Sequence, residues 1–455
     1  MSELDVLIIG AGTAGQTAAF DLVAEGYRVA VVEKSREPGG ICALHGCQAK
    51  KWFYEMTELV ARSRHLQGLG ITASPSFSWS QIQNEKNSFT SQIPSATIAN
   101  LKGNGVEYIE GEAVFTDPDT IMVNGTPYKP RFTLIAAGAK PMPLSIEGSE
   151  HLATSNDFLD LEKLPKRITL VGGGFISFEF AHFAARLGAK EVYILEAMDR
   201  PLGPFDSAMV EQLVKASQVE GIQVQTGVSI QSISREDTGF IVKFASGEPI
   251  ETDLVVHGAG RVADLDGLNL KTAGIAYNRR GIEVDGCMRT TNPKVYAVGD
   301  SAATLQLARV ADNEAHTAAA SILAEDSEET ISPLDYTAAP AILFTYPMLG
   351  MVGKTEDELI KEGTRYWKSF DKELNWPTFR RVGLKHAAYK ILVGNDSKIL
   401  GAHILSDNAT GLINTFKQAM LDGKTVSELY QANIMSPYPS RESDILYMLE
   451  PLLDE

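Results

Sequence analysis

Near the N-terminus the strand-like run Asp5–Ile9 (DVLII), apolar after its first residue, is followed by Gly10–Gly15 (GAGTAG), and this stretch decides the fold. The apolar run predicts a buried strand, and the glycines predict a tight turn into a helix. A dinucleotide pyrophosphate needs close backbone approach and a helix N-terminus, which a glycine turn provides. A second apolar run ends at Glu33, where a carboxylate can accept a hydrogen bond from a ribose hydroxyl. The start of the chain therefore predicts a dinucleotide-binding unit.

A second unit of the same form lies in mid-chain. Ile168–Val171 (ITLV) leads into Gly172–Ser177 (GGGFIS), and the next apolar run ends at Glu196. A serine replaces the third glycine of this motif, but a small residue still allows close packing of helix and strand. Glu196 occupies the position of the acid, and no arginine stands there to receive a 2′-phosphate, which favours NADH over NADPH. Arg200 lies nearby and leaves that choice open.

Short strands alternate with helical stretches along most of the chain, which predicts an α/β protein with parallel sheets. Residues 132–139, 254–261 and 295–300 repeat the pattern of a strand followed by glycine. From about Pro340 the sequence changes to strand-rich segments and amphipathic helices. This change predicts a separate C-terminal domain.

Two of the three cysteines, Cys42 and Cys47, lie just beyond the first nucleotide-binding unit, and only Cys287 is left over. Two cysteines at this position predict a redox pair beside a cofactor. Zinc is a poor alternative, because four residues separate the cysteines and no second ligand pair follows. We therefore expect no metal site.

Composition narrows the function classes. The 455 residues include 41 basic and 58 acidic side chains, for a formal net charge of −17. Such an acidic chain is a poor candidate for binding nucleic acid or an anionic membrane. No apolar stretch approaches the roughly 20 residues of a membrane helix, and the N-terminus runs into the first strand without a secretory pattern. We expect a cytoplasmic protein, in which a persistent disulfide is more often catalytic than structural.

Taken together, these segments resemble the pyridine nucleotide–disulfide oxidoreductases, the family of dihydrolipoamide dehydrogenase, glutathione reductase and mercuric reductase. Residues 39–51 (GGICALHGCQAKK) are similar to the redox-disulfide motif of that family. Further similar segments are Ala136–Gly138, Ala259–Arg261, Val298–Asp300 and Pro340–Pro347.

The resemblance implies the architecture and the cofactors. We expect two Rossmann-like dinucleotide-binding domains, for FAD and NAD(H), and an α+β C-terminal domain that forms a homodimer. The implied boundaries are 1–147 with 270–335 for the FAD domain, 148–269 for the NAD domain, and 336–455 for the interface domain.

The resemblance also implies which residues bind the cofactors. Those expected to contact FAD are Gly10, Gly12, Gly15, Glu33, Gly40, Ala137, Gly138 and Asp300. Those expected to contact NAD(H) are Gly172, Gly174, Phe175, Glu196 and Gly260. Phe175 holds an aromatic position that gates the nicotinamide site, and core packing is the alternative interpretation.

By family position, Cys47 is the thiol nearest the flavin and Cys42 is the interchange thiol that attacks the substrate. The thiolate is the nucleophile in such an exchange, so we expect a depressed thiol pKa. Lys51 sits where the family has a lysine close to flavin N5, and Glu179 where it has the partner acid.

The sequence departs from the family near its C-terminus. Family members that reduce soluble disulfides carry a histidine, held by a glutamate, that moves protons at the interchange thiol. Tyr438 stands at the histidine position and Ser443 at the glutamate position, and no histidine follows His403. A tyrosine is a poor base at neutral pH, since its ordinary pKa is about 10. His45, between the two cysteines, is a second candidate for the missing base.

Residues 52–54 (WFY) follow Lys51, where the family has smaller aliphatic residues. Core packing and a reshaped substrate entrance are both possible explanations.

The expected function is therefore that of an enzyme, an NADH-dependent FAD flavoprotein that passes electrons through Cys42 and Cys47 to an atypical acceptor. An unusual disulfide, a metal or metalloid, a quinone and a partner redox protein all fit. Two alternatives stay open. One is a dihydrolipoamide dehydrogenase variant in which Tyr438 or His45 replaces the missing base. The other is a flavin redox sensor or electron-entry subunit of a complex.

Overall fold

The computed structural model describes residues 4–327 and 329–453. The chain divides into two compact units, each made of three segments. Met1–Trp52, Ile82–Pro143 and Gly260–Asp335 form the first unit, and Phe53–Gln81, Leu144–Ala259 and Tyr336–Glu455 form the second. Two helices, α3 (Cys47–His65) and α4 (Trp79–Thr90), run across these divisions.

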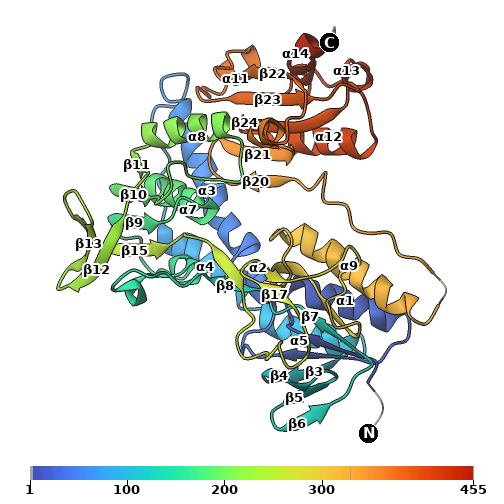
Figure 1. Ribbon diagram of the computed structural model, residues 1–455. Helices are drawn as coiled ribbons and strands as arrows, with labels where there is room; N and C mark the ends of the chain where they lie inside the picture. The colour runs from blue at the N-terminus through green and yellow to red at the C-terminus, as the bar shows by residue number, and fades with distance from the viewer. Residues whose placement is uncertain (1–3, 328, 454–455) are drawn as a thin grey trace. The chain divides into compact units, whose positions relative to one another are not determined.

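The first unit is built on a five-stranded parallel sheet in the order β19-β7-β1-β2-β3. Its helices α1 and α9 pack against each other (Figure 1). The strands of this sheet are β1 (Val6–Ile9), β2 (Val29–Glu33), β3 (Glu107–Glu110), β7 (Phe132–Ile135) and β19 (Val295–Ala297). The helices of the unit are α1 (Thr13–Ala24), α2 (Gly40–Leu44), α5 (Ile93–Gly103), α9 (Ala308–Ala324) and the 3₁₀ turn η2 (Gly299–Ser301).

Smaller antiparallel sheets complete the first unit. They pair β4 (Ala113–Asp117), β5 (Thr120–Val123) and β6 (Thr126–Tyr128); β8 (Ala139–Pro141) and β16 (Arg261–Ala263); and β17 (Tyr277–Asn278) and β18 (Gly281–Ile282).

The second unit contains a four-stranded parallel sheet in the order β11-β10-β9-β15. Its strands are β9 (Arg167–Val171), β10 (Glu191–Leu195), β11 (Ile222–Gln225) and β15 (Leu254–His257). The accompanying elements are η1 (Ser149–His151), α6 (Ser155–Leu159), α7 (Phe175–Arg186), α8 (Ser207–Val219), and the antiparallel strands β12 (Ile230–Glu236), β13 (Gly239–Phe244) and β14 (Ile250–Thr252).

The C-terminal part of the second unit is a five-stranded antiparallel sheet in the order β20-β21-β24-β23-β22. Its strands are β20 (Ala341–Leu343), β21 (Met348–Gly353), β22 (Trp367–Asp371), β23 (Ala388–Val393) and β24 (Ile399–Ser406). Its helices are α10 (Glu356–Glu362), α11 (Pro377–Arg380), α12 (Ala409–Leu421), α13 (Val426–Asn433), α14 (Ile445–Leu449) and η3 (Glu450–Leu452). The change in sequence pattern near Pro340 thus coincides with the change from a parallel to an antiparallel sheet.

Three strands of the first parallel sheet are buried on both faces, as expected for strands covered by helices. All residues of β1 are buried, as are all residues of β7 and β19. Among the described residues, no helix combines the length and apolar character needed to cross a membrane.

A buried ion cluster stabilises the second unit. The Lys390 ammonium donates to Asp206 Oδ1 at 2.7 Å and to Glu356 Oε2 at 2.7 Å. The side chains of Lys390 and Asp206 are 1% and 0% exposed. Burial raises the pKa of Glu356, but hydrogen bonds from Lys368, Lys390 and Tyr366 outweigh it and lower that pKa to about 2.

Lys390→Met is expected to destabilise this region by about 3–5 kcal/mol, because it leaves two carboxylates without their buried partner. Hydrogen exchange of the β23 and β24 amides measures the loss. Lys368→Met is the matched control: Lys368 also binds Glu356, at 2.7 Å, but is 47% exposed, so we expect a loss of at most about 1 kcal/mol. Equal losses in the two variants would contradict the argument from burial.

The pH dependence of the cluster follows from the low pKa of Glu356. The ordinary value is 4.5 and the folded value about 2, so its stabilisation is present above pH 4.5 and is lost as the pH falls through that window. The Lys390→Met protein should therefore lose less additional stability on acidification.

Candidate functional site

The first glycine turn forms a cradle made of backbone alone. Gly12 caps the N-terminus of α1 without a side-chain hydrogen bond, so the first N–H groups of the helix face no capping side chain. A Cβ on Gly40 would lie 2.6 Å from the Cα of Gly12, so α2 approaches this turn more closely than any side chain permits. Position 10 also excludes a side chain, since a Cβ on Gly10 would lie 2.3 Å from the carbonyl oxygen of Ala136. A Cβ on Gly15 would lie 2.0 Å from the carbonyl oxygen of Gly10.

Glu33 ends β2 and binds the same turn: its Oε2 accepts a hydrogen bond from Ala11 N at 2.8 Å. Ala137 and Gly138 follow the neighbouring strand β7. Asp300 lies in η2, and burial raises the pKa of its carboxyl group, with the Arg261 guanidinium acting in the opposite direction. An uncapped helix N-terminus, a cradle that a Cβ would fill and a half-buried carboxylate fit the pyrophosphate and the hydroxyl groups of a dinucleotide.

The second glycine turn has the same construction. Gly174 caps α7 without a side-chain hydrogen bond, and a Cβ on Gly172 would lie 2.3 Å from Ala259 Cα. Glu196 follows β10 and its Oε2 accepts from Gly173 N at 2.5 Å. Phe175, the first residue of α7, is 50% exposed, which does not agree with the core-packing alternative. Gly260, the fifth residue expected to bind NAD(H), belongs to the first unit, where its carbonyl accepts from Met142 N at 3.1 Å.

The structure explains the serine at the third glycine position of this turn. Ser177 is buried, and a Cβ on Gly258 would lie 1.9 Å from its Oγ. The space that the missing glycine would have left is thus provided by a glycine on the opposing segment. The local motif around Ser177 carries no signal for this exchange, because Gly258 belongs to a distant segment of the sequence.

The two cysteines lie in the first unit on consecutive helices, the short α2 and the first turn of the long α3. Cys42 is in α2 and half-buried, whereas Cys47 begins α3 and is exposed. A hydrogen bond links the two side chains, and Thr13 hydrogen bonds to Cys42 from the start of α1. His45, half-buried, caps the C-terminus of α2, where its N–H donates to the Ile41 carbonyl.

The expectation of a depressed pKa is not met at Cys42. The hydrogen bond with Cys47 is the largest cause and raises the pKa of Cys42, burial raises it further, and the negative charge of Asp312 acts in the same direction. The hydrogen bond with the Thr13 hydroxyl acts in the opposite direction and lowers the pKa of Cys42. The neighbouring thiol and burial thus both disfavour the thiolate form of Cys42.

Lys51 lies in the first unit and Glu179 in the second. Glu179 is 1% exposed, and its Oε1 accepts from Phe344 N at 2.9 Å. The pairing of these two residues therefore stays a prediction from the resemblance.

Of the three aromatic residues after Lys51, two are buried. Phe53 packs on Trp79 with ring centroids 4.6 Å apart, and Tyr54 contacts Phe344 edge-on at 5.4 Å. Trp52 is 37% exposed and faces Phe89 at 6.3 Å. Core packing thus accounts for Phe53 and Tyr54.

Tyr438 is 78% exposed in the segment that follows α13. Ser443 does not support it: the Ser443 hydroxyl donates to the Ser440 carbonyl at 2.8 Å and accepts from Ser440 N at 3.1 Å. The serine at the glutamate position therefore closes a local turn. Among the described residues, no group of three or more His, Cys, Asp or Glu side chains is placed to hold a metal ion.

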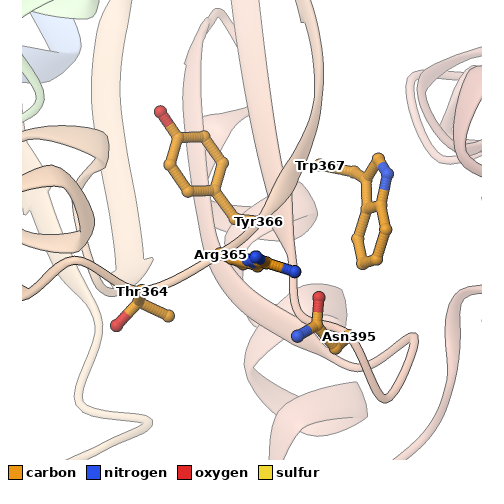
Figure 2. A pocket seen from close by; sticks show the side chains of 5 residues that line it. All are labelled: Thr364, Arg365, Tyr366, Trp367 and Asn395. Atoms are coloured by element: carbon orange, nitrogen blue, oxygen red, sulfur yellow. The ribbon is translucent and has the colours of Figure 1, made fainter.

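A shallow pocket of about 520 Å³ lies beside the edge strand β22, lined by the five residues in Figure 2. One of them, Tyr366, donates to Glu356 at 2.7 Å. The pocket contains none of the residues predicted from the sequence, and we do not assign it to the candidate site.

Two nucleotide-binding sheets, a cysteine pair on helices beside the first glycine turn, and a C-terminal antiparallel sheet define a class of redox proteins that couple a dinucleotide to a dithiol. Comparison with known proteins agrees. Residues 4–315 match the family described as pyridine nucleotide-disulphide oxidoreductase, and residues 339–445 match its dimerisation domain. The chain belongs to the pyridine nucleotide-disulphide oxidoreductase family, whose members use FAD and NAD(P)H.

Relatives span nearly the whole chain. A dihydrolipoyl dehydrogenase of Staphylococcus aureus is 30% identical over 438 residues, covering 94% of this chain and 92% of the relative. A glutathione reductase of Burkholderia cepacia is 30% identical over 420 residues, covering 90% of this chain and 91% of the relative. The HOCl-induced flavoprotein disulfide reductase RclA from Escherichia coli, solved as a Cu(II) complex, shares the fold with a TM-score of 0.87 at 24% identity, covering 99% of this chain and 100% of that one.

Proposed function

We propose that this protein is an NADH-dependent FAD enzyme that reduces an atypical acceptor through the dithiol of Cys42 and Cys47. It acts as a homodimer through the C-terminal dimerisation domain, and in the cytoplasm, where a reactive cysteine pair is typical of a redox catalyst. FAD and the nicotinamide nucleotide, when bound, supply the hydride and electron transfer that reduces the cysteine pair. The first glycine turn, Glu33 and Asp300 hold FAD, and the second turn with Glu196 holds NADH.

The observation that carries this proposal is the hydrogen-bonded pair of cysteines beside the Gly12–Gly40 cradle. Its position next to a turn built for a pyrophosphate supports electron exchange between the dithiol and a flavin. The atypical acceptor is supported by the C-terminal segment, in which Tyr438 is exposed and Ser443 closes its own turn. Neither provides the held base that rapid exchange with lipoamide or glutathione disulfide requires.

Anaerobic titration of the purified protein with NADH tests the redox role. We expect uptake of about two hydride equivalents per subunit, one for the flavin and one for the disulfide. A long-wavelength absorbance band from a thiolate beside the flavin should appear after the first. Uptake of one equivalent without this band would contradict a working cysteine pair and leave a simple flavoprotein.

The same titration with NADPH tests the choice of nucleotide. Because Glu196 would repel a 2′-phosphate, we expect reduction by NADPH to be slower by about 10-fold or more. Equal rates would contradict the NADH preference.

A panel of acceptors then separates the candidates: lipoamide, glutathione disulfide, a soluble quinone and Cu(II). Lipoamide turnover at the rate of NADH reduction would favour the dihydrolipoamide dehydrogenase alternative. A negligible rate with every small acceptor would favour an electron-entry subunit. Cu(II) belongs in the panel because a dithiol is a soft ligand and RclA was solved as a Cu(II) complex.

A further inference from the structure

Arg200 lies near the acid of the second nucleotide site, and the proposed function assigns it no role. An arginine close to the acid at a strand end is the kind of residue that could receive the 2′-phosphate of NADPH. Arg200 belongs to residues 196–206, the segment between β10 and α8, which we call the β10–α8 loop. The loop and the residues that it contacts all lie in the second unit, and their contacts indicate what the guanidinium does.

Both terminal nitrogens of the Arg200 guanidinium are engaged close to the start of α8. Nη1 donates to the Phe205 carbonyl at 2.7 Å, and Nη2 donates to the Gly203 carbonyl at 3.1 Å. Nη2 also lies 3.8 Å from Oδ2 of Asp357. The same carboxylate accepts from the N–H and the hydroxyl of Ser207, at 3.1 and 2.9 Å. The planar fork of an arginine suits such a set of acceptors, so Arg200 connects the loop to the beginning of α8.

The turn that Arg200 closes contains a strained residue. Leu202 has a φ of +50°, in the left-handed region that a leucine disfavours, and it is 3% exposed. Such a conformation persists only where the surrounding contacts hold it, and it is found most often at functional sites. Because the bond from Arg200 to Phe205 spans the turn on both sides of Leu202, the arginine helps to hold this conformation.

The strained turn packs on the second glycine turn. Leu202 N donates to the Gly173 carbonyl at 2.9 Å, and a Cβ on Gly173 would lie 2.7 Å from Pro201 Cβ. The N–H of Gly173 donates in turn to Glu196 Oε2 at 2.5 Å. Gly173 therefore links the two parts of the loop: its carbonyl binds Leu202, and its N–H binds the carboxylate of Glu196.

Glu196 is held at both of its oxygens. Oε2 accepts from Gly173 N, and Oε1 accepts from Met198 N at 2.7 Å. A carboxylate has about four acceptor sites, so two backbone donors orient it and leave it able to accept from ribose hydroxyls. A group that is ordered before the ligand arrives binds more tightly than a mobile one, because less freedom is lost on binding.

We propose that Arg200 is a positioning residue of the second nucleotide site and is not a receptor for a 2′-phosphate. It holds the β10–α8 loop on Gly173 and, through Gly173, orients the Glu196 carboxylate. The site therefore selects a dinucleotide whose adenosine ribose carries no phosphate. The inference rests on the proposed function, in which the second glycine turn and Glu196 bind NADH, and it names a further residue that sets this selectivity.

The test measures the dissociation constants of NAD⁺ and NADP⁺ for the FAD-loaded dimer by isothermal titration calorimetry, which needs no turnover. For Arg200→Met we expect NAD⁺ to bind about 10-fold more weakly, an effect typical of lost charge-assisted hydrogen bonds. The dissociation constant of NADP⁺ should change by less than about 3-fold, since its 2′-phosphate loses no contact and meets a less firmly held carboxylate. The preference for NAD⁺ should therefore fall, whereas loss of a phosphate receptor would raise it.

Arg235→Met is the control for the loss of one positive charge. Arg235 is exposed on β12 of the same unit, and both dissociation constants of this variant should equal those of the parent. The FAD content and the circular dichroism of each variant check that it is folded. If Arg200→Met does not fold, Arg200→Lys carries the same expectation, because lysine keeps the charge but not the planar fork.

A second background tests the phosphate alternative directly. Glu196→Ser removes the carboxylate that would repel a 2′-phosphate. In this background the addition of Arg200→Met should leave the affinity for NADP⁺ unchanged. A loss of about 10-fold or more would identify Arg200 as a ligand of the phosphate and overturn the inference.

Failure of the inference and failure of the proposed function are distinguishable. If the parent protein binds NADP⁺ as tightly as NAD⁺, the proposed preference for NADH is wrong and both proposals are overturned. If the parent prefers NAD⁺ but Arg200→Met weakens NADP⁺ alone or changes neither constant, only the role of Arg200 is overturned. Equal weakening of both nucleotides would also overturn it, because a site that is merely distorted does not distinguish the two riboses.

Discussion

Cys42→Ser is expected to lower the reduction of any acceptor that needs the dithiol by about 1000-fold or more, while NADH still reduces the bound flavin. A serine cannot form a disulfide with Cys47, so the pair can neither store two electrons nor attack an acceptor. Because the glycine turns do not involve the Cys42 side chain, FAD binding and the reaction with NADH should persist. Anaerobic NADH titration measures the reduction of the flavin, and steady-state assays with the acceptor panel measure the reduction of the acceptor.

The same reasoning predicts that Cys47→Ser also abolishes acceptor reduction and additionally removes the long-wavelength band, if Cys47 is the thiol nearest the flavin. Cys287→Ser is the control. Cys287 is half-buried and its Sγ contacts the Ile331 carbonyl at 3.7 Å, with no part in the pair. Its substitution should change neither the reduction of the flavin by NADH nor the reduction of the acceptor. Acceptor reduction by Cys42→Ser at more than about a tenth of the parent rate would contradict electron flow through the pair.

Gly40→Ala is expected to lower FAD affinity by about 100-fold, which corresponds to about 3 kcal/mol. Gly40 has a φ of +77°, in the left-handed region that side chains disfavour, and its Cβ would lie 2.6 Å from Gly12 Cα. The atom in the way is backbone, so α2 must move away from the first turn and open the cradle. The FAD content of the purified protein, read from its visible absorbance, measures the effect.

Gly26→Ala is the control that separates the steric clash with Gly12 from the strain of a side chain at positive φ. Gly26 has a similar φ of +84° in the same unit, but no atom lies within 4 Å of its Cβ position. We expect this variant to be slightly less stable and to retain its FAD. Circular dichroism on both variants checks that they are folded. Equal FAD content in the two variants would show that the close approach of α2 to Gly12 is not needed for binding.

The sequence by itself determined the cofactor units and the cysteine pair. These features are local: a strand, a glycine turn and an acid at the next strand end lie within about 30 residues of one another. The chemistry that they serve, backbone approach to a phosphate, requires glycine whatever surrounds it.

Only the tertiary structure decided the environment of the reactive thiol. Asp312, whose charge acts on Cys42, lies 270 positions further along the chain, and no local pattern connects the two. The raised pKa of Cys42 likewise depends on burial and on neighbouring charge, which composition does not reveal. The fit of Ser177 against Gly258 and the buried bond between Lys390 and Asp206 are of the same kind. Each depends on side chains that meet only when the chain is folded, because packing and electrostatics act through distance in space and not along the sequence.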